Sequence, residues 1–145
     1  MVPTVRMVKS FLQKVDQIFP TALSEKQKLD EFADKLCTKA TLCAAYEGNE
    51  IVSMVAGYTE NIVDNKAYIS IVATCPEKQG RGYASKLVKE FIAICDTKGI
   101  EAVHLYAASV NCPALNMYAR LGFEEWIIPN EPRPEDIHLI YYLKK

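Results

Sequence analysis

This chain has almost no excess of positive over negative charge, or the reverse. Its 145 residues include 17 lysines and arginines against 18 aspartates and glutamates, which gives a formal net charge of −1. A domain this balanced lacks the basic surface with which proteins bind nucleic acid or anionic membranes. We therefore expect a small-molecule or peptide partner, with no nucleic acid and no membrane involved.

Long apolar runs are missing too. No stretch of the sequence approaches the roughly 20 apolar residues of a membrane-spanning helix. The start, Met-Val-Pro-Thr-Val-Arg-Met, does not have the basic flank and continuous apolar region of a signal peptide. The expected location is therefore the cytoplasm.

Metal-binding and disulfide patterns are absent as well. The chain has two histidines, and its five cysteines are scattered, without a C-x-x-C pair. Structural zinc and disulfide frameworks need regularly spaced or paired ligands. We therefore expect reduced, mostly buried thiols and no metal site. The cysteines are Cys37, Cys43, Cys75, Cys95 and Cys112.

The chain does contain enough hydrophobic residues, 50% of the total, to form one packed domain over residues 1–145.

Apolar positions at three- and four-residue spacing predict two helices in an N-terminal helical part at about residues 4–39. The first is expected over 5–19 and ends at Pro20. The second is expected over 24–39, with Ser24 and Gln27 as a capping box.

From residue 41 onward, strand-like and helix-like segments alternate. The order α-α-β-β-β-α-β-α-β-β predicts an α+β (mixed α/β) fold, in which helices flank a mixed, mostly antiparallel sheet. Gly48-Asn49 indicates a hairpin turn, and 129–136 is too rich in proline to be anything but a loop. The expected strands are 41–46, 51–58, 67–73, 102–107, 123–128 and 137–143, and the later helices run from about Ala84 to Gly99 and from Asn111 or Cys112 to Gly122.

The rest of the chain is organised around the stretch from Thr74 to Ala84, where a strand ends, a short loop follows and a helix begins. Gly80 and Gly82 let the backbone turn sharply and approach a ligand closely. The first N–H groups of the helix are unpaired and lie at the positive end of its macrodipole. This arrangement predicts a diphosphate site, with an ordinary glycine turn as the alternative.

A dinucleotide site is one interpretation of this stretch, because Gly80-x-Gly82-x-x-Ser85 follows a strand and opens a helix. The fingerprint is incomplete, however. Ser85 stands in place of the third glycine, and the strand 102–107 has no acidic residue at its end to bind a ribose. A dinucleotide enzyme is therefore the weakest of the alternatives.

This stretch and a second motif further along the chain together favour another ligand. Gln79-Gly-Arg-Gly-Tyr-Ala84 resembles the Gln/Arg-x-x-Gly-x-Gly/Ala signature of the GNAT superfamily of acetyl-CoA-dependent N-acetyltransferases. Asn111-x-x-Ala114-x-x-x-Tyr118-x-x-Leu-Gly-Phe123 is similar to the second signature of that family, and it follows in the expected order. The resemblance covers about residues 41–143, which would form the acyl-CoA-binding core.

The resemblance implies a division of roles among the residues of these motifs. The loop would bind the diphosphate of coenzyme A, the preceding strand would pair with the pantetheine arm, and the N–H of Val72 would stabilise the oxyanion. Tyr118 would be the general acid that protonates the coenzyme A thiolate. The implied cofactor-binding residues are Val72, Ala73, Thr74, Gln79, Gly80, Arg81, Gly82, Tyr83, Ala84, Asn111, Ala114 and Tyr118.

Each of these roles has a structural alternative. Arg81 can be a solvated loop residue, Asn111 a plain helix N-cap and Tyr118 an aromatic residue of the core.

An amine acceptor with a pKa near that of lysine, about 10.4, must lose a proton before it attacks the thioester. The strand 67–73 contains no acidic residue. Tyr68 and His104 are therefore our candidate bases, with Ser70, Tyr106 and Glu60 as further possibilities. Strand alternation places His104 and Tyr106 on one face, although a packed, hydrogen-bonded His104 is the alternative, and His138 is expected to be structural.

The expected activity is direct acetyl transfer from acetyl-CoA to an amine of a small molecule, amino sugar or peptide, in a ternary complex. The alternatives are a non-catalytic acyl-CoA sensor on the same fold and a covalent route through Cys75 or Cys112. The acceptor is expected between the N-terminal helices and the loop 129–136, whose Glu131, Glu135 and Asp136 can favour a cationic amine. The protein is expected to be a monomer or a homodimer, the latter paired through strand 137–143.

Overall fold

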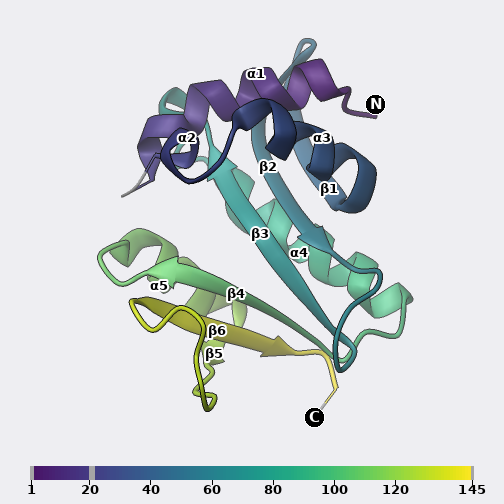
Figure 1. Ribbon diagram of the computed structural model, residues 1–145, viewed down its shortest axis with the longest axis vertical. Coiled ribbons are helices and arrows are strands. Elements are labelled where there is room, and N and C mark those ends of the chain that lie inside the picture. The colour runs from purple at the N-terminus through teal and green to yellow at the C-terminus, as the bar shows by residue number, and fades with distance from the viewer. Residues whose placement is uncertain (1, 20–21, 145) are drawn as a thin grey trace.

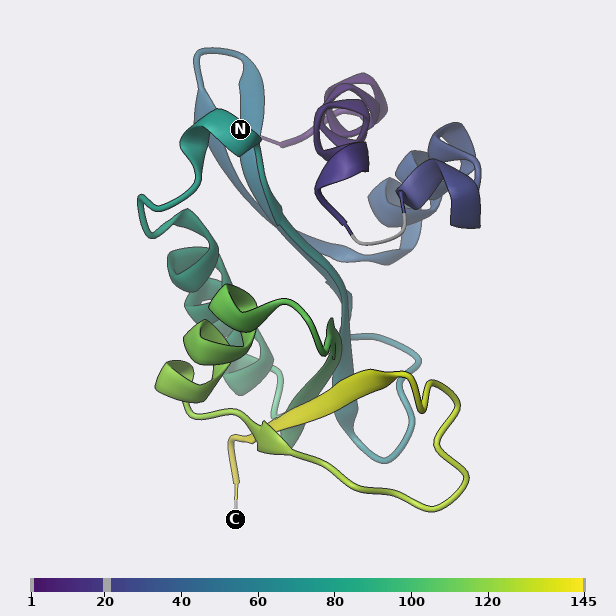
Figure 2. The ribbon, with the colours of Figure 1, turned by 90° about the vertical axis from the view of Figure 1, so that its left-hand side faces the viewer.

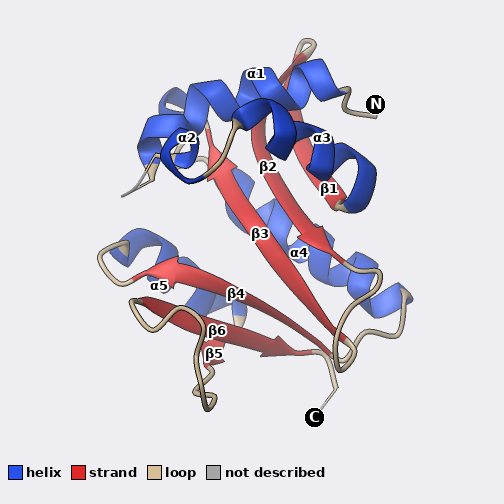
Figure 3. Cartoon of the chain, in the orientation of Figure 1, coloured by secondary structure: helices blue, strands red, loops and turns tan. Residues whose placement is uncertain are grey.

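The computed structural model describes residues 2–19 and 22–144. Within them, six strands form one sheet in the order β1-β2-β3-β4-β6-β5, with helices on both faces (Figures 1 and 3). β3 and β4 pair in parallel, and all other neighbours are antiparallel. The α+β fold is therefore confirmed. The strands are β1 (Thr41–Glu47), β2 (Glu50–Tyr58), β3 (Lys66–Thr74), β4 (Ala102–Ala108), β5 (Glu124–Glu125) and β6 (Asp136–Tyr142), and the helices are α1 (Val5–Val15), α2 (Leu23–Lys26), α3 (Leu29–Lys39), α4 (Tyr83–Thr97) and α5 (Cys112–Leu121).

The helices lie in two layers, one on each face of the sheet. Figure 2 shows the sheet edge-on, with α1, α2 and α3 on one side and α4 and α5 on the other. Each layer has its own hydrophobic core, one around Phe11 of α1 and one around Phe91 of α4, both almost completely buried. The amphipathic spacing of the helices produces this division, because each helix buries one apolar stripe against the sheet.

The two expected N-terminal helices differ from the structure. α1 ends at Val15 and continues as a 3-10 turn over Asp16–Ile18, while Pro20 lies outside the described residues. The expected helix over 24–39 is wrong in its first part, because Gln27 and Lys28 are extended and separate α2 from α3. Ser24 does not cap the helix: its N–H and hydroxyl both donate to Asp16, each over 2.7 Å.

The last two strands also differ from the expectation. β5 covers two residues instead of 123–128, although Trp126 N–H still donates to His138 O over 2.8 Å. Ile127 beyond it is 85% exposed and has no core to pack against. β6 lies between β4 and β5 and not at the edge of the sheet, so the expected dimer contact through strand 137–143 is not available along its paired length.

A bulge in β3 changes which face of the sheet its side chains point to, so that β3 contributes to both hydrophobic cores. Ile69 faces Gly57 and Ile71 faces Ala56 on β2, so Ser70 between them has no partner in the register. The extra residue reverses the alternation of side chains. As a result, Ile69 packs in the core under α4, whereas Ile71 packs in the core under α1.

After the pair Tyr68 and His104, β3 and β4 separate. Only Lys66–Tyr68 pair with Ala102–His104, although β3 continues to Thr74 and β4 to Ala108. Figure 1 shows the two strands diverging toward the end at which the loop before α4 begins. The splayed halves of the sheet therefore leave one backbone edge of β3 without a neighbouring strand.

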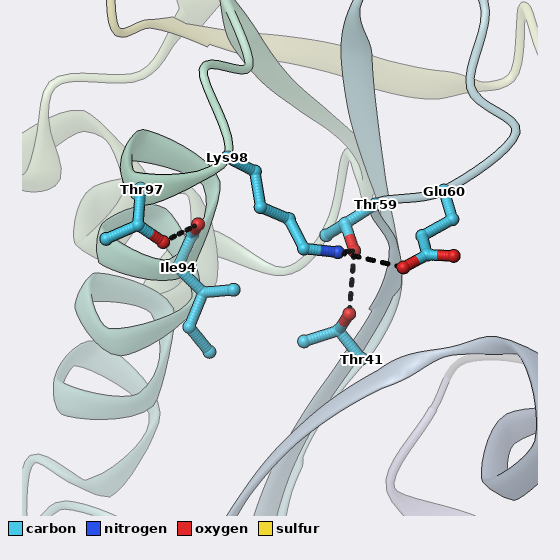
Figure 4. A network of polar contacts seen from close by, with 6 residues as sticks. All are labelled: Thr41, Thr59, Glu60, Ile94, Thr97 and Lys98. Atoms are coloured by element: carbon cyan, nitrogen blue, oxygen red, sulfur yellow. Dashed lines mark hydrogen bonds and ion pairs between the residues drawn. The ribbon is translucent and has the colours of Figure 1, made fainter.

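At the opposite end, polar contacts attach the C-terminus of α4 to the sheet (Figure 4). Lys98 Nζ donates to Thr59 Oγ1 over 2.8 Å and lies 3.3 Å from Glu60 Oε1. Thr59 Oγ1 also lies 2.8 Å from the hydroxyl of Thr41 at the start of β1. Glu60, a possible base in the sequence, therefore pairs with a lysine at the end of α4 that is remote from the glycine loop.

Gly57 allows α4 to approach the sheet closely. A Cβ atom at this position would lie 2.6 Å from Phe91 Cζ and 2.7 Å from Tyr68 O. We expect Gly57→Ala to lower the free energy of unfolding by about 1–3 kcal/mol, as overpacked cores do, measured by urea denaturation.

A matched control is Gly48→Ala in the β1–β2 turn. There a Cβ meets no described atom within 4 Å, and only the positive φ of +62° opposes the change. Combining Gly57→Ala with Phe91→Leu should recover part of the loss. Strict additivity of the two losses would show that the ring of Phe91 is not the obstacle.

Candidate active site

The loop between β3 and α4 presents helix N–H groups to an open space. Gly80 and Gly82 have φ angles of +79° and +82°, and Gly82 is the N-cap of α4 without a side-chain cap hydrogen bond. The helical hydrogen bonds begin with Lys86 N–H to Gly82 O, at 3.1 Å. A Cβ on either glycine would meet no described atom within 4 Å. The backbone can therefore receive an anionic group here.

Side chains around this loop hold it against the sheet. Gln79 Nε2 donates to Thr74 O over 3.3 Å. Lys78 Nζ pairs with Glu47 over 2.7 Å, and the Tyr83 hydroxyl donates to the same carboxylate. The hydrogen bond from Lys78, together with its charge, holds the pKa of Glu47 below its usual value. Lys78 and the exposed Arg81 place two cations beside the glycines.

The free edge of β3 offers backbone groups to the opening. Cys75 N–H donates to Val52 O of β2 over 2.8 Å. Because N–H groups of successive strand residues point to alternate sides, the N–H groups of Thr74 and Val72 point away from β2. They face the side from which β4 has diverged, where an extended ligand can pair with them.

α5 borders the opening from the other side of the divergence. Asn111 caps the helix, and its side chain accepts a hydrogen bond from Ala114 N–H over 3.3 Å. Tyr118 is 5% exposed and packs against Phe123, with ring centroids 5.5 Å apart. Its hydroxyl forms no hydrogen bond to another described residue, and burial raises its pKa well above the usual value. The phenol therefore stays protonated and can donate.

On the face opposite α4, aromatic and histidine side chains gather where β3 and β4 separate. The ring of His104 lies 5.1 Å from that of Tyr68, 5.0 Å from that of His138 and 5.4 Å from that of Trp126. Tyr106 stacks on His138 at 4.1 Å. The expectation that His104 and Tyr106 share one face is confirmed.

Glu131 is the centre of a hydrogen-bond network over this face. Its Oε1 accepts from the Tyr106 hydroxyl over 2.5 Å and from Arg133 N–H over 3.1 Å. Its Oε2 lies 2.8 Å from His138 Nδ1. Arg133 also pairs with Asp136 over 2.6 Å. Two of the three acidic residues that we expected to attract an acceptor are therefore occupied within the protein.

The shifts in pKa differ in direction between the tyrosine and histidine candidates for the base. Burial raises the pKa of Tyr68, despite the nearby Arg133, and raises that of Tyr106 further above its usual value, which makes both phenols poor bases. Burial, then the neighbouring His138 and Lys66, lower the pKa of His104 to about 4. His104 is therefore neutral near pH 7 with an unprotonated ring nitrogen, and its lowered pKa makes it a weaker base than a free imidazole unless a neighbouring negative charge stabilises its protonated form.

The comparisons with known proteins agree with this geometry. Residues 9–123 match the family model described as the acetyltransferase (GNAT) family. The chain belongs to the GNAT family of acetyltransferases. The resemblance drawn from the two motifs is thereby confirmed.

Individual GNAT relatives match this chain over different lengths. The mycothiol acetyltransferase of Arthrobacter sp. (strain FB24) is 40% identical over 58 residues, which are 40% of this chain and 18% of that protein. The chain spans about a fifth of the length of the curated relatives that it matches first.

Solved structures of the family share the whole fold. The ribosomal-protein-S18-alanine N-acetyltransferase of Escherichia coli has a TM-score of 0.74 at 16% identity, covering 97% of this chain and 88% of that one. The PaiA N-acetyltransferase of Thermoplasma acidophilum, in complex with coenzyme A, has a TM-score of 0.67 at 14% identity, covering 95% and 89%. At such identities the likeness shows the GNAT fold alone.

Within this GNAT domain, the two motifs lie at helix starts on the same face of the sheet, at α4 and α5. Three of the base candidates, Tyr68, His104 and Tyr106, lie on the other face, near the start of the divergence. The sequence predicted a structural role for His138 and an acceptor-attracting role for Glu131, and no local pattern links these two residues, which are separated by a proline-containing loop.

The cysteines, the metal-ligating side chains and the length of the helices bear on the other expectations for this GNAT domain. All five cysteines are free, and burial raises the pKa of Cys75, which makes it a weak nucleophile. No group of three or more His, Cys, Asp or Glu side chains in the described residues can hold a metal ion. None of the described helices is long and apolar enough to cross a membrane.

Proposed function

We propose that this protein transfers the acetyl group of acetyl-CoA directly to an amine nitrogen in a ternary complex. The observation that carries the proposal is the unpaired edge of β3, which connects the glycine loop at one end to the side chains of Tyr68 and His104 at the other. GNAT membership and the coenzyme A bound in the Thermoplasma relative support the choice of donor.

The donor would bind along this edge. The backbone from Gln79 to Ala84 would hold the diphosphate, with Arg81 supplying a charge-assisted contact. The pantetheine arm would pair with Val72, Ala73 and Thr74, and reach Asn111 and Ala114 at the start of α5. The cap role of Asn111 is compatible with this contact, because its oxygen accepts from one N–H only.

The chemistry needs an oriented thioester, a donor to the oxyanion and a proton for sulfur. The N–H of Val72 would stabilise the oxyanion. Tyr118 would protonate the departing thiolate. His104 would take the proton of the acceptor ammonium, with Tyr68 lining the same site.

The acceptor would be an amine of a small molecule, amino sugar or peptide. The curated relatives named mycothiol acetyltransferase favour a small molecule that carries an amine. The position of the base on the face of α1 and α3 supports an acceptor site between these helices and the loop 126–135, which joins β5 to β6.

The test has two steps. Acetyl-CoA at 100 times its Kd should stabilise the protein by about 2.7 kcal/mol, which a thermal scan measures. A thiol-release assay with a panel of amines should then show release of coenzyme A that depends on one amine class. Binding without any amine-dependent release would favour the alternative, a non-catalytic acyl-CoA sensor, and absence of binding would refute both.

A further inference from the structure

A chain of hydrogen bonds crosses the sheet face under the loop 126–135 and ends at His104. Glu131 Oε2 lies 2.8 Å from His138 Nδ1, and His138 Nε2 lies 2.8 Å from His104 Nδ1. The three side chains come from the loop, β6 and β4. Those of Glu131 and His138 are 19% and 4% exposed, so bulk water competes little for these bonds.

The position of each proton follows from the acceptor at one end. An ionised carboxylate only accepts hydrogen bonds, so His138 must donate from Nδ1. The Nε2 of a neutral His138 then carries a lone pair, which accepts from the Nδ1–H of His104. The lone pair of His104 is therefore at Nε2, which has no hydrogen bond to another described residue.

Burial opposes the ionisation of Glu131, but the hydrogen bonds from Tyr106, His138 and Arg133 N–H hold its pKa below the usual value. The carboxylate thus stays ionised near neutral pH and keeps the two imidazoles in this arrangement. Arg133 closes the network by lying over the ring of Tyr106, 4.8 Å from its centroid.

We propose that Glu131, His138 and His104 form a proton relay in which His104 Nε2 takes the proton of the acceptor ammonium. The proposal rests on the proposed acetyl transfer and adds to its base, His104, the two residues that orient it and share its charge. His104 is the catalytic residue, and His138 and Glu131 are positioning residues that set its tautomer and share the charge.

The relay accounts for every proton in the reaction. The ammonium gives one proton to His104 Nε2, and the Nδ1 proton of His104 moves to His138 Nε2, which leaves an imidazolium beside the carboxylate of Glu131. The amine forms the C–N bond, and the C–S bond breaks as Tyr118 protonates sulfur. The acceptor nitrogen then loses a second proton, which returns to the phenolate of Tyr118. The proton held by His104 and His138 is released to solvent.

The other groups around His104 explain why the carboxylate is needed. Lys66 and His138 disfavour a positive charge on His104, whereas Glu131 favours it. Tyr68, Tyr106 and Arg133 also line the face, and none of them carries a negative charge near pH 7. Without Glu131, a proton on the histidine pair would have no opposite charge in contact with it.

Glu131→Gln tests the relay with little change of shape. The amide oxygen can still accept from Tyr106 and Arg133 N–H, so the loop stays attached. The amide nitrogen, however, donates to His138 Nδ1, which reverses both tautomers and puts a hydrogen on His104 Nε2. At pH 7 we expect kcat/KM for the amine to fall about 10- to 100-fold, with an unchanged Kd for acetyl-CoA.

The dependence on pH separates a lost base from a loosened loop. Without the relay the enzyme uses only free amine, so the deficit should shrink as the pH approaches the pKa of the acceptor, near 10 for an alkylamine. The control Glu125→Gln makes the same chemical change on β5, beside β6, and should remain within about twofold of wild type. A deficit in Glu131→Gln that is constant with pH, or no deficit, would overturn the relay.

A second readout does not depend on turnover. The ¹⁵N shifts of wild-type His104 should show a protonated Nδ1 and a bare Nε2, and Glu131→Gln should invert them. A hydrogen on Nε2 in the wild type would refute the relay even if acetyl transfer is observed. If no amine is acetylated, the proposed function fails, while these shifts still decide whether the hydrogen-bonded relay exists.

Discussion

Tyr118→Phe should lower kcat for acetyl transfer by about 100- to 10,000-fold, the range typical of a lost general acid. The phenol of Tyr118 forms no hydrogen bond to another described residue, and burial keeps it protonated. Its removal would leave the departing thiolate without a proton donor. The Kd for acetyl-CoA should stay within about twofold, because the ring contact with Phe123 is retained.

The pH profile gives a second check on Tyr118. Because its pKa lies above the usual value of about 10, the acid form persists through the working range. Loss of kcat from ionisation of this phenol is therefore expected only above pH 10. An alkaline limb between pH 7 and 9 that disappears in Tyr118→Phe would contradict the raised pKa.

Tyr58→Phe is the matched control for this variant. The Tyr58 hydroxyl is buried and has no hydrogen-bond partner among the described residues. Deleting a buried, unpaired hydroxyl should leave the rate unchanged and stability unchanged or higher. If Tyr118→Phe behaves like Tyr58→Phe, Tyr118 is a core aromatic residue and not the acid.

Gly82→Val should raise the KM for acetyl-CoA about 100-fold while changing kcat much less. Gly82 has φ of +82° at the N-cap of α4, a conformation that a β-branched residue rarely adopts. The backbone must turn away, and the first N–H groups of α4 then no longer converge on the diphosphate. Steady-state kinetics over a wide range of acetyl-CoA concentrations measures the effect.

A shortened donor shows whether the defect concerns the diphosphate. S-acetylpantetheine lacks that group, so wild type and Gly82→Val should use it with equal kcat/KM. Gly48→Val introduces the same kind of backbone strain at φ +62° in the remote β1–β2 turn and should leave the KM for acetyl-CoA unchanged. An equal loss with both donors would indicate general damage and contradict the diphosphate role of the loop.

The fold was largely predictable because its signals are local. Apolar spacing identified α1 and α4, a cap at Asn111 or Cys112 identified the start of α5, the turn at Gly48 and Asn49 identified the first hairpin, and Gly99 and Gly122 marked helix ends. The errors lie where a tertiary contact overrides local preference. Ser24 binds Asp16 instead of capping a helix, and β5 is short because little packs on the segment beyond Trp126.

The sequence by itself determined the family and located the glycine loop that we propose binds the donor, since two motifs of fixed spacing need only a strand end and a helix start to be placed. The tertiary structure alone decided which side chains meet across the sheet. The bulge at Ser70 and the divergence of β3 from β4 set which backbone groups stay unpaired. The contact of Glu131 with His138, and of His138 with His104 on another strand, depends on strand order and register, which no local pattern of residues encodes.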